Sequence, residues 1–321
     1  MKRILVTGAG GFIGHHLVKR LRAEGNWVRG VDVKLPEFEP TAAHSFLLLD
    51  LRYRDHCWLA AEGVDEIYQL AADMGGIGYI TSHLSTIARN NTLINVSMLE
   101  AARRHGIKNY LYTSSACVYA QDKQTETAVT PLKESDAYPA APEAGYGWEK
   151  LYAEQMCHYY QHDYGIQTRI VRFHNVYGPL GTWDGGREKS PAALCRKIAR
   201  AKLDPLGTSI DIWGDGRQTR SYMHIDDCIE GLIRLMASGY TQPLNLGTDQ
   251  LVSIDGLADI IQVIADTAFT YEHVAGPQGV RGRNSDNSQL RAVLGWEPKI
   301  QLEEGLKPTY VWIEEQVRNQ K

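Results

Sequence analysis

The central part of the chain encodes a strand followed by a helix. It reads Leu111-Tyr-Thr-Ser-Ser-Ala-Cys-Val-Tyr119, then a polar loop, then Ala144-Gly-Tyr-Gly-Trp-Glu-Lys150. The β-branched and aromatic residues up to Ser115 predict a buried strand, and the helix-forming residues from about 144 to 160 predict a helix. Ser115 and Cys117 therefore fall at the end of a strand, where open α/β sheets bind their ligands.

Tyr146 and Lys150 lie one turn apart on the predicted helix, so their side chains share a face. We expect the Lys150 ammonium to favour the phenolate and to lower the pKa of Tyr146 from its usual value of about 10. The phenolate can then accept a proton from a substrate hydroxyl, with Ser115 as hydrogen-bond partner. Because many surface helices carry this spacing, the pair needs support from the rest of the chain.

A glycine-rich loop near the start of the chain predicts a dinucleotide site. A strand over residues 2–6 leads into Thr7-Gly-Ala-Gly-Gly-Phe-Ile-Gly14, and a helix with apolar periodicity follows to about residue 23. Gly8, Gly11 and Gly14 suit a tight turn, a close approach to a pyrophosphate and close helix packing. The N-terminus of the helix favours the phosphate anion.

The second predicted strand, over residues 27–31, ends in Asp32. Its distance from the glycine loop matches that of an acidic residue that binds the adenosine ribose. A carboxylate at this position repels a 2'-phosphate, so NAD is favoured over NADP, although Lys34 weakens that inference slightly. Residues 45–50 and 66–72 predict a third and a fourth strand.

Size and composition allow one large or two modest domains with a sizeable core. The chain has 321 residues, of which 43% are hydrophobic, and its 34 basic and 38 acidic residues nearly balance. This balance gives no electrostatic case for a nucleic acid or a membrane as partner. The five cysteines are widely spaced and lack a metal-type Cys-x-x-Cys, so we expect a reduced, cytoplasmic protein without a metal. The short apolar run after Met1 does not suit a secretory signal.

Several longer pieces of sequence resemble a known family. They are Ala72-Asp-Met-Gly-Gly-Ile-Gly78, Ser114-Ser-Ala-Cys-Val-Tyr119, Lys133-Glu-Ser-Asp136, Arg172-Phe-His-Asn-Val-Tyr-Gly-Pro179, Gly185-Gly-Arg-Glu-Lys189, Trp213-Gly-Asp-Gly216 and Gly279-Val-Arg-Gly-Arg-Asn-Ser-Asp-Asn287. With the Ser, Tyr and Lys above, the chain resembles the extended short-chain dehydrogenase/reductase family, and within it the GDP-mannose 3,5-epimerases. The resemblance extends over nearly the whole chain.

This resemblance implies an α/β fold: a doubly wound parallel sheet, the Rossmann-like NAD domain, with a smaller mixed α/β substrate domain. The Gly/Pro-rich sequence after residue 175 favours a domain boundary there. We expect the NAD domain over 1–175 and about 214–240, and the nucleotide-sugar domain over 176–213 and 241–321. The resemblance also implies a homodimer, in which a long helix over 84–105 pairs with the helix of Tyr146.

The resemblance further implies the residues of the site. The catalytic residues are Ser115, Cys117, Tyr146, Lys150 and Lys189. NAD is bound by Gly8, Gly11, Phe12, Ile13, Gly14, Asp32, Asp50, Leu51, Ala71, Tyr146 and Lys150. The nucleotide-sugar substrate, GDP-mannose, is bound by Gly75, Ser115, Ala116, Cys117, Asn175, Glu188, Lys189, Lys197, Gln218, Arg220 and Arg281.

Several of these residues also have plainer interpretations. Asp50 could cap a helix over 54–62, and the glycines of 74–78, which predict a loop over the site, could form a simple connector. Lys189 precedes Ser190-Pro191, which predicts the start of a helix to about residue 201. The positive end of that helix should ease deprotonation of Lys189, whereas a solvated surface lysine is the alternative.

Cys117 and Lys189 distinguish the expected reaction from a simple alcohol oxidation. Oxidation of carbon 4 of a hexose acidifies the hydrogens on carbons 3 and 5. Cys117 would remove those protons and Lys189 would deliver protons to the opposite face, or the two roles could be exchanged. The thiol must be partly ionised for this chemistry.

Other functions remain open at this point. Cys117 could simply pack behind the nicotinamide, and the same fold serves carbon 4 epimerases and dehydratases as well as NAD-binding regulators without activity. The loop after Tyr119 departs from the epimerase pattern, so GDP-L-gulose, the product inverted at carbon 5 only, could compete with GDP-L-galactose. The residues do not identify guanine directly.

Overall fold

Seven parallel strands form the larger sheet of this computed structural model, which describes residues 1–320. Their order is β10-β6-β5-β4-β1-β2-β3. The bounds are β1 Arg3–Thr7, β2 Trp27–Asp32, β3 Ser45–Leu48, β4 Glu66–Gln69, β5 Asn109–Ser115, β6 Gln167–Phe173 and β10 Pro243–Leu246. The chain moves outward from β1 to β3 and then returns to β4 on the other side of β1. This reversal creates a crevice at the carboxyl ends of the strands, where ligands bind in such sheets.

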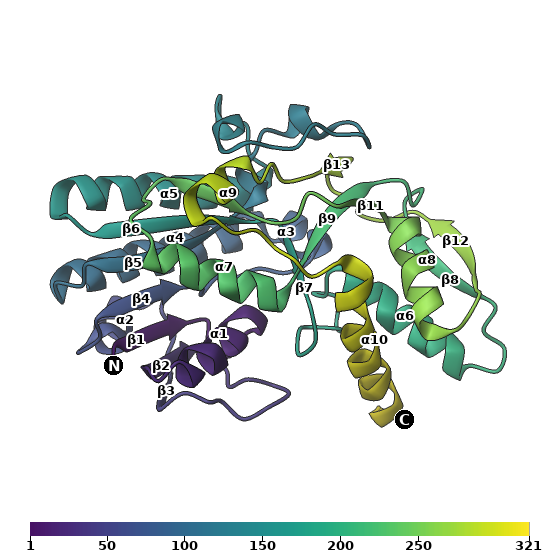
Figure 1. The fold of residues 1–321 in the computed structure, drawn as a ribbon, viewed down its shortest axis with the longest axis horizontal. Helices are drawn as coiled ribbons and strands as arrows, with labels where there is room; N and C mark the ends of the chain where they lie inside the picture. The colour runs from purple at the N-terminus through teal and green to yellow at the C-terminus, as the bar shows by residue number, and fades with distance from the viewer. Residues whose placement is uncertain (321) are drawn as a thin grey trace.

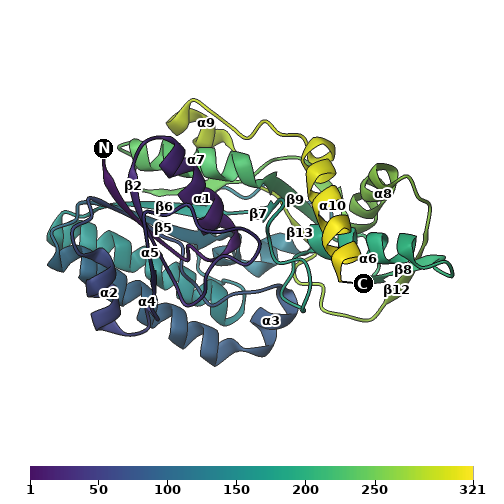
Figure 2. The same cartoon turned by 90° about the horizontal axis from the view of Figure 1, so that it is seen from below.

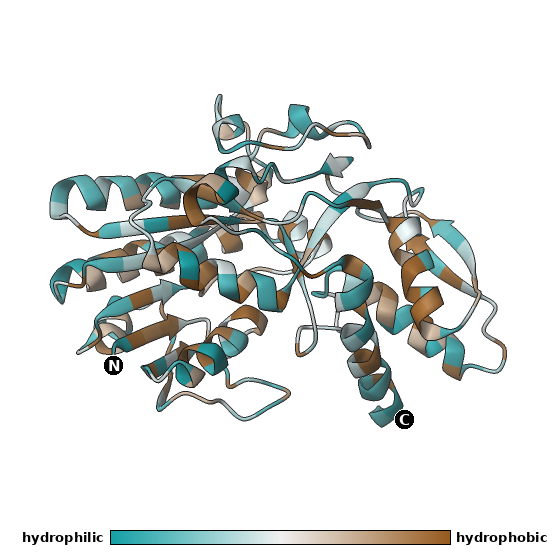
Figure 3. Cartoon of the chain, in the orientation of Figure 1, coloured by the Kyte–Doolittle hydropathy of each residue, from teal (hydrophilic) through white to brown (hydrophobic). Residues whose placement is uncertain are grey.

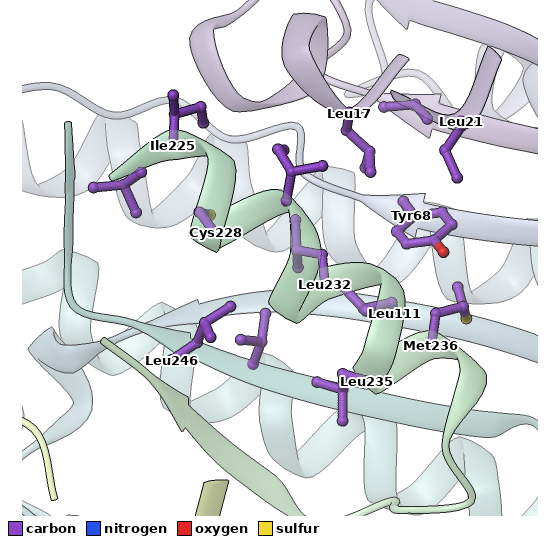
Figure 4. Packing of buried hydrophobic residues seen from close by; sticks show 14 of the residues in the cluster. Leu17, Leu21, Tyr68, Leu111, Ile225, Cys228, Leu232, Leu235, Met236 and Leu246 are labelled. Atoms are coloured by element: carbon purple, nitrogen blue, oxygen red, sulfur yellow. The ribbon is translucent and has the colours of Figure 1, made fainter. Parts of the chain in front are cut away.

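Helices cover both faces of this sheet (Figures 1 and 2). Helices α1 (Phe12–Ala23), α7 (Ile225–Ala237) and α9 (Ser288–Leu294) lie on one face, and α2 (Arg54–Ala61), α4 (Leu84–Arg104) and α5 (Ala144–Tyr164) lie on the other. Figure 4 shows Leu232 and Leu235 of α7 among the apolar residues between this helix and the sheet. Both leucines are fully buried. Removing that apolar surface from water stabilises the layer that carries the site.

A smaller unit is formed by segments that alternate along the chain with the last elements of the large sheet. Strand β9 (Thr219–His224) is paired with β7 (Asn175–Tyr177), β11 (Leu251–Ser253) and β13 (Gly282–Arg283), and β8 (Ser209–Trp213) is paired with β12 (Thr270–Val274). Helices α6 (Ser190–Leu203), α8 (Ile254–Ala265) and α10 (Leu302–Asn319) surround a separate apolar core. The apolar residues of α8 are plain in Figure 3. No helix in the described part of the chain has the length and apolar composition of a membrane span.

The predicted fold class is confirmed, and the structure changes two local expectations. Residues 74–78 are not all loop, because α3 (Ile77–Ser82) begins after Gly76 and includes Gly78. Strand β10 belongs to the seven-stranded sheet, and helix α9 packs against it. The domain boundaries predicted from the sequence had assigned residues 241–321 to the smaller domain. Strand β10 is short, and only its parallel pairing with β6 assigns it to this sheet.

Candidate active site

The glycine loop forms a cradle that fits a dinucleotide. A Cβ atom on Gly14 would lie 2.1 Å from the carbonyl oxygen of Gly8, so only glycine lets α1 start this close to β1. No side chain caps the N-terminus of α1 at Gly11. The N–H groups of the first turn therefore remain available for an anion such as a pyrophosphate.

Two acidic residues lie where the adenosine end of NAD is expected. The Asp32 carboxylate accepts a hydrogen bond from the backbone N–H of Gly10 at 3.0 Å, and burial raises the pKa of Asp32. Asp50 forms hydrogen bonds with the Arg52 guanidinium, which lowers the pKa of Asp50. Asp50 is not the N-cap of α2, because that position is Tyr53.

Leu51 is buried in the core, and the N–H of Ala71 donates to the Thr7 hydroxyl. The cofactor contacts of these residues stay predictions.

Ser115 and Cys117 are held against the start of α5. Ser115 ends β5, and its hydroxyl oxygen accepts a hydrogen bond from the N–H of Cys117 at 3.2 Å. The carbonyl oxygen of Cys117 accepts from the N–H of Glu143 at 2.9 Å. A Cβ atom on Gly147 would approach that carbonyl to 2.3 Å, so glycine is required for α5 to lie here. Strand and helix thus bring Ser115, Ala116 and Cys117 next to Tyr146.

Tyr146 and Lys150 share a helix face as predicted, but their electrostatics differ from the expectation. The Lys150 ammonium donates to the carbonyl oxygen of Thr113 at 3.0 Å and lies 5.6 Å from the centre of the Tyr146 ring. Burial, together with nearby Glu149, raises the pKa of Tyr146 well above its ordinary value, and burial lowers that of Lys150. The predicted lowering of the Tyr146 pKa was wrong, because desolvation of the phenolate and the Glu149 charge outweigh the hydrogen bond with Ser115, which acts in the opposite direction.

The Cys117 sulfur contacts an arginine that the sequence analysis did not select. Arg283 on β13 places its guanidinium 3.6 Å from the sulfur and donates to the Glu143 carboxylate at 2.8 Å. Burial raises the pKa of the Cys117 thiol, whereas the Arg283 guanidinium opposes that rise. Glu143 was also missed. The run Gly279-Val-Arg-Gly-Arg283 offered a signal, since it contains two arginines, but it did not show which one enters the site.

Lys189 belongs to the same site. It is the N-cap residue of α6, which begins at Ser190, so the helix start is confirmed but the N-cap lies one residue before the predicted Ser190. Burial lowers the pKa of Lys189, while the nearby Cys117 thiolate would raise it. The direction of the shift agrees with the expectation, but its main cause is desolvation of the ammonium. An amine with a lowered pKa next to a thiol is suited to proton transfer.

The basic residues expected at the diphosphate are only partly brought together. Half-buried Arg220 lies on β9, and burial with nearby Arg283 lowers the pKa of Arg220 to about 10. Lys197 is paired with Asp211 at 2.8 Å, and Arg281 is paired with Asp215 at 2.7 Å. Lys197 and Arg281 must therefore exchange a carboxylate for a phosphate if they bind substrate.

Four other predicted substrate residues make contacts within the chain. The Asn175 amide donates to the carbonyl oxygen of Ser221, and the Gln218 amide donates to that of Trp213. Glu188 is paired with Arg196 at 2.5 Å. Gly75 lies in the loop before α3, next to Tyr79. Their contacts with substrate stay predictions.

Replacing Arg283 with glutamine is expected to raise the pKa of Cys117 further, because a neutral amide stabilises the thiolate less than a guanidinium does. A rate that requires the thiolate then reaches half its maximum at higher pH than in the wild type, and the pH profile of kcat/KM measures this shift. Arg281→Gln should leave the midpoint in place, since Asp215 holds that guanidinium. An unmoved midpoint in Arg283→Gln would count against the contact with the sulfur.

The chain is similar to known proteins along nearly its whole length. Residues 4–247 match the NAD dependent epimerase/dehydratase family. Over 321 residues the chain is 50% identical to GDP-mannose 3,5-epimerase 1 of Oryza sativa subsp. japonica. The alignment covers 99% of this chain and 83% of the relative. The chain is 49% identical to GDP-mannose 3,5-epimerase of Arabidopsis thaliana, with 99% and 84% covered.

Solved structures share the fold. The UDP-glucose 4-epimerase of Thermotoga maritima with UDP-glucose matches with a TM-score of 0.86 at 25% identity, covering 98% of this chain and 99% of that chain. The UDP-glucuronic acid 4-epimerase of Bacillus cereus in complex with UDP-glucuronic acid and NAD matches with a TM-score of 0.83 at 25% identity and the same coverage.

Proposed function

This chain belongs to the NAD dependent epimerase/dehydratase family, and from that membership we propose that it epimerises GDP-D-mannose at carbons 3 and 5 to GDP-L-galactose. The observation that carries the proposal is the meeting of Cys117, Arg283 and Lys189 in one site beside Tyr146. The proposed reaction oxidises carbon 4 and then exchanges protons at the neighbouring carbons. It therefore requires a thiol and an amine next to Tyr146 and Lys150.

The oxidation at carbon 4 rests on the start of α5. NAD, held by the glycine cradle at the start of α1, would supply reversible hydride transfer at carbon 4. Tyr146 accepts the proton of the carbon 4 hydroxyl, and Ser115 orients that hydroxyl. Lys150, whose ammonium donates to the Thr113 carbonyl oxygen, stabilises the Tyr146 phenolate that accepts this proton.

The epimerisation rests on Cys117 and Lys189. The carbon 4 ketone acidifies the hydrogens on carbons 3 and 5. Cys117 removes each proton as the thiolate, which Arg283 stabilises, and Lys189 delivers a proton to the opposite face. Cys117 in place of a carboxylate beside Ser115 argues against a dehydratase.

Incubation of the purified protein with GDP-mannose, followed by separation of the nucleotide sugars, tests this function. We expect GDP-L-galactose, with GDP-L-gulose as the product inverted at carbon 5 only. UDP-glucose and UDP-glucuronic acid serve as comparison substrates because the solved relatives bind them. Conversion of a UDP-sugar at carbon 4, without conversion of GDP-mannose, would replace the proposal by a carbon 4 epimerase.

We also propose a homodimer formed through α4 and α5. Trp148, Tyr152 and Tyr159 form one exposed stripe on α5, and each is about half exposed. Leu93 is exposed on α4, which packs beside α5. An exposed apolar stripe of this kind is typical of an interaction surface.

The free, buried state of all five cysteines supports the cytoplasmic location predicted above.

The double substitution Trp148→Glu and Tyr152→Glu is expected to give a monomer, because each carboxylate would have to be buried without a partner. Light scattering during size-exclusion chromatography measures the mass. The matched control is Val311→Glu, which replaces an apolar residue of similar exposure on α10. A wild-type monomer, or a double variant that stays dimeric, would refute this interface.

A further inference from the structure

The placement of Lys189 depends on its neighbours in the chain. Its ammonium makes no hydrogen bond or ion pair within residues 1–320. The two residues before it are held instead. Glu188 is paired with Arg196, and the carbonyl oxygen of Arg187 accepts a hydrogen bond from the N–H of Gly76 at 3.1 Å. The segment that carries Lys189 is therefore attached to the loop before α3.

The Arg187 side chain makes a second attachment to that region. Its guanidinium lies 3.9 Å from the centre of the Tyr79 ring, which is on α3. The His83 ring stacks on Tyr79 with 4.4 Å between ring centres. Both Arg187 and His83 therefore contact the Tyr79 ring. A guanidinium over a tyrosine face is attracted by the ring quadrupole.

Tyr79 is fixed in turn to the helix of the catalytic pair. Its hydroxyl donates to the Asp73 carboxylate at 2.8 Å, and the N–H of Asp73 donates to the Asn91 side chain at 2.6 Å. Asn91 on α4 donates to buried Glu149 at 2.7 Å, the residue before Lys150 on α5. Figure 2 shows α3 beside α4. A continuous line of contacts thus joins the helix of Tyr146 to the segment of Lys189.

We propose that Tyr79 is a positioning residue for proton transfer by Lys189. By holding Arg187, it sets the distance of Lys189 from the sugar relative to Tyr146. Lys189 does not take part in the oxidation at carbon 4, so loss of this contact should affect the exchange of carbon-bound protons and leave hydride transfer unchanged. The inference rests on the epimerase function proposed above.

Tyr79→Leu and Arg187→Met test the contact from its two sides. Solvent deuterium uptake into the sugar should fall by roughly 10- to 100-fold, the order expected when a catalytic group is misplaced by about 1 Å. Hydride transfer, followed by the absorbance of the reduced nicotinamide, should be unchanged, and KM should change less than kcat. Arg187→Lys keeps the cation and should retain most of the uptake, whereas Tyr79→Phe keeps the ring but loses the hydrogen bond to Asp73 and should give an uptake between those of Tyr79→Leu and the wild type.

Arg104→Met is the matched control. It removes a guanidinium that lies 4.0 Å from the centre of the Trp58 ring, on an exposed surface away from the site, and both rates should stay at the wild-type level. Wild-type deuterium uptake in Tyr79→Leu and Arg187→Met would overturn the proposal. An equal fall of hydride transfer and uptake would also overturn it, because the contact would then maintain the site as a whole.

A second measurement does not depend on turnover. Release of the segment should expose Lys189, so an amine-labelling reagent should modify it faster in Tyr79→Leu than in the wild type, as measured by mass spectrometry. Equal labelling rates in the two proteins would contradict the positioning role. Failure of the wild type to convert GDP-mannose would count against the proposed function instead, and the labelling comparison would still decide the role of Tyr79.

Discussion

Cys117→Ala is expected to abolish solvent deuterium uptake into the sugar while oxidation at carbon 4 continues. Cys117 is the only cysteine whose sulfur contacts a guanidinium within residues 1–320, and it lies beside Tyr146. Alanine cannot accept a proton, and loss of a general base lowers a rate by roughly 10²- to 10⁴-fold. Mass spectrometry of the nucleotide sugar after reaction in deuterated water measures the uptake.

Cys195→Ala is the matched control for this experiment. Cys195 is also a buried free thiol, but it packs in the core of the smaller unit. We expect Cys195→Ala to take up deuterium like the wild type. Unchanged uptake in Cys117→Ala would end the role of Cys117 in proton transfer and leave it as a packing residue.

Arg172→Met is expected to lower the free energy of unfolding by about 3–5 kcal/mol, the effect of leaving a buried charge without its partner. The Arg172 guanidinium on β6 donates two hydrogen bonds to the Glu154 carboxylate on α5, at 3.0 and 2.7 Å. Both side chains are almost fully buried. Burial opposes the charge on Arg172, but Glu154 raises the pKa of Arg172 above its ordinary value. Urea denaturation at a fixed NAD concentration measures the change.

Two further variants separate the buried charge from other effects. Arg172→Met combined with Glu154→Gln should recover part of the lost stability, because no unpaired charge is then buried. Arg291→Met breaks an exposed pair with Glu297 and should change the stability by less than about 1 kcal/mol. An Arg172→Met variant as stable as Arg291→Met would refute the importance of the buried pair.

The stability of this pair bears directly on the site. Glu154 also accepts a hydrogen bond from the Ser114 hydroxyl at 2.5 Å, and Ser114 precedes Ser115 on β5. The pair therefore joins α5, β5 and β6 behind the catalytic residues.

Local sequence determined the glycine cradle, most of the helices and the central strands. It also brought Ser115 and Cys117 to the end of β5 and placed Tyr146 and Lys150 on one helix face. These features follow from glycine geometry, from apolar periodicity and from N-cap signals such as Ser190-Pro191, all of which act over a few residues. Strands β7, β10, β11, β12 and β13 were not predicted; β7, β11 and β13 have only two or three residues each, which is too few for a periodicity to show.

Tertiary structure alone decided which partners meet. In the folded chain Arg283 contacts the Cys117 sulfur, whereas Arg281 is paired with Asp215. The Lys150 ammonium donates to the carbonyl oxygen of Thr113. Tertiary structure also reversed the expected pKa shift of Tyr146 through burial. The physical reason is that backbone conformation is encoded by neighbouring residues. Desolvation and charge pairing, in contrast, depend on groups that are distant in the sequence and meet only when the sheet and the smaller unit pack together.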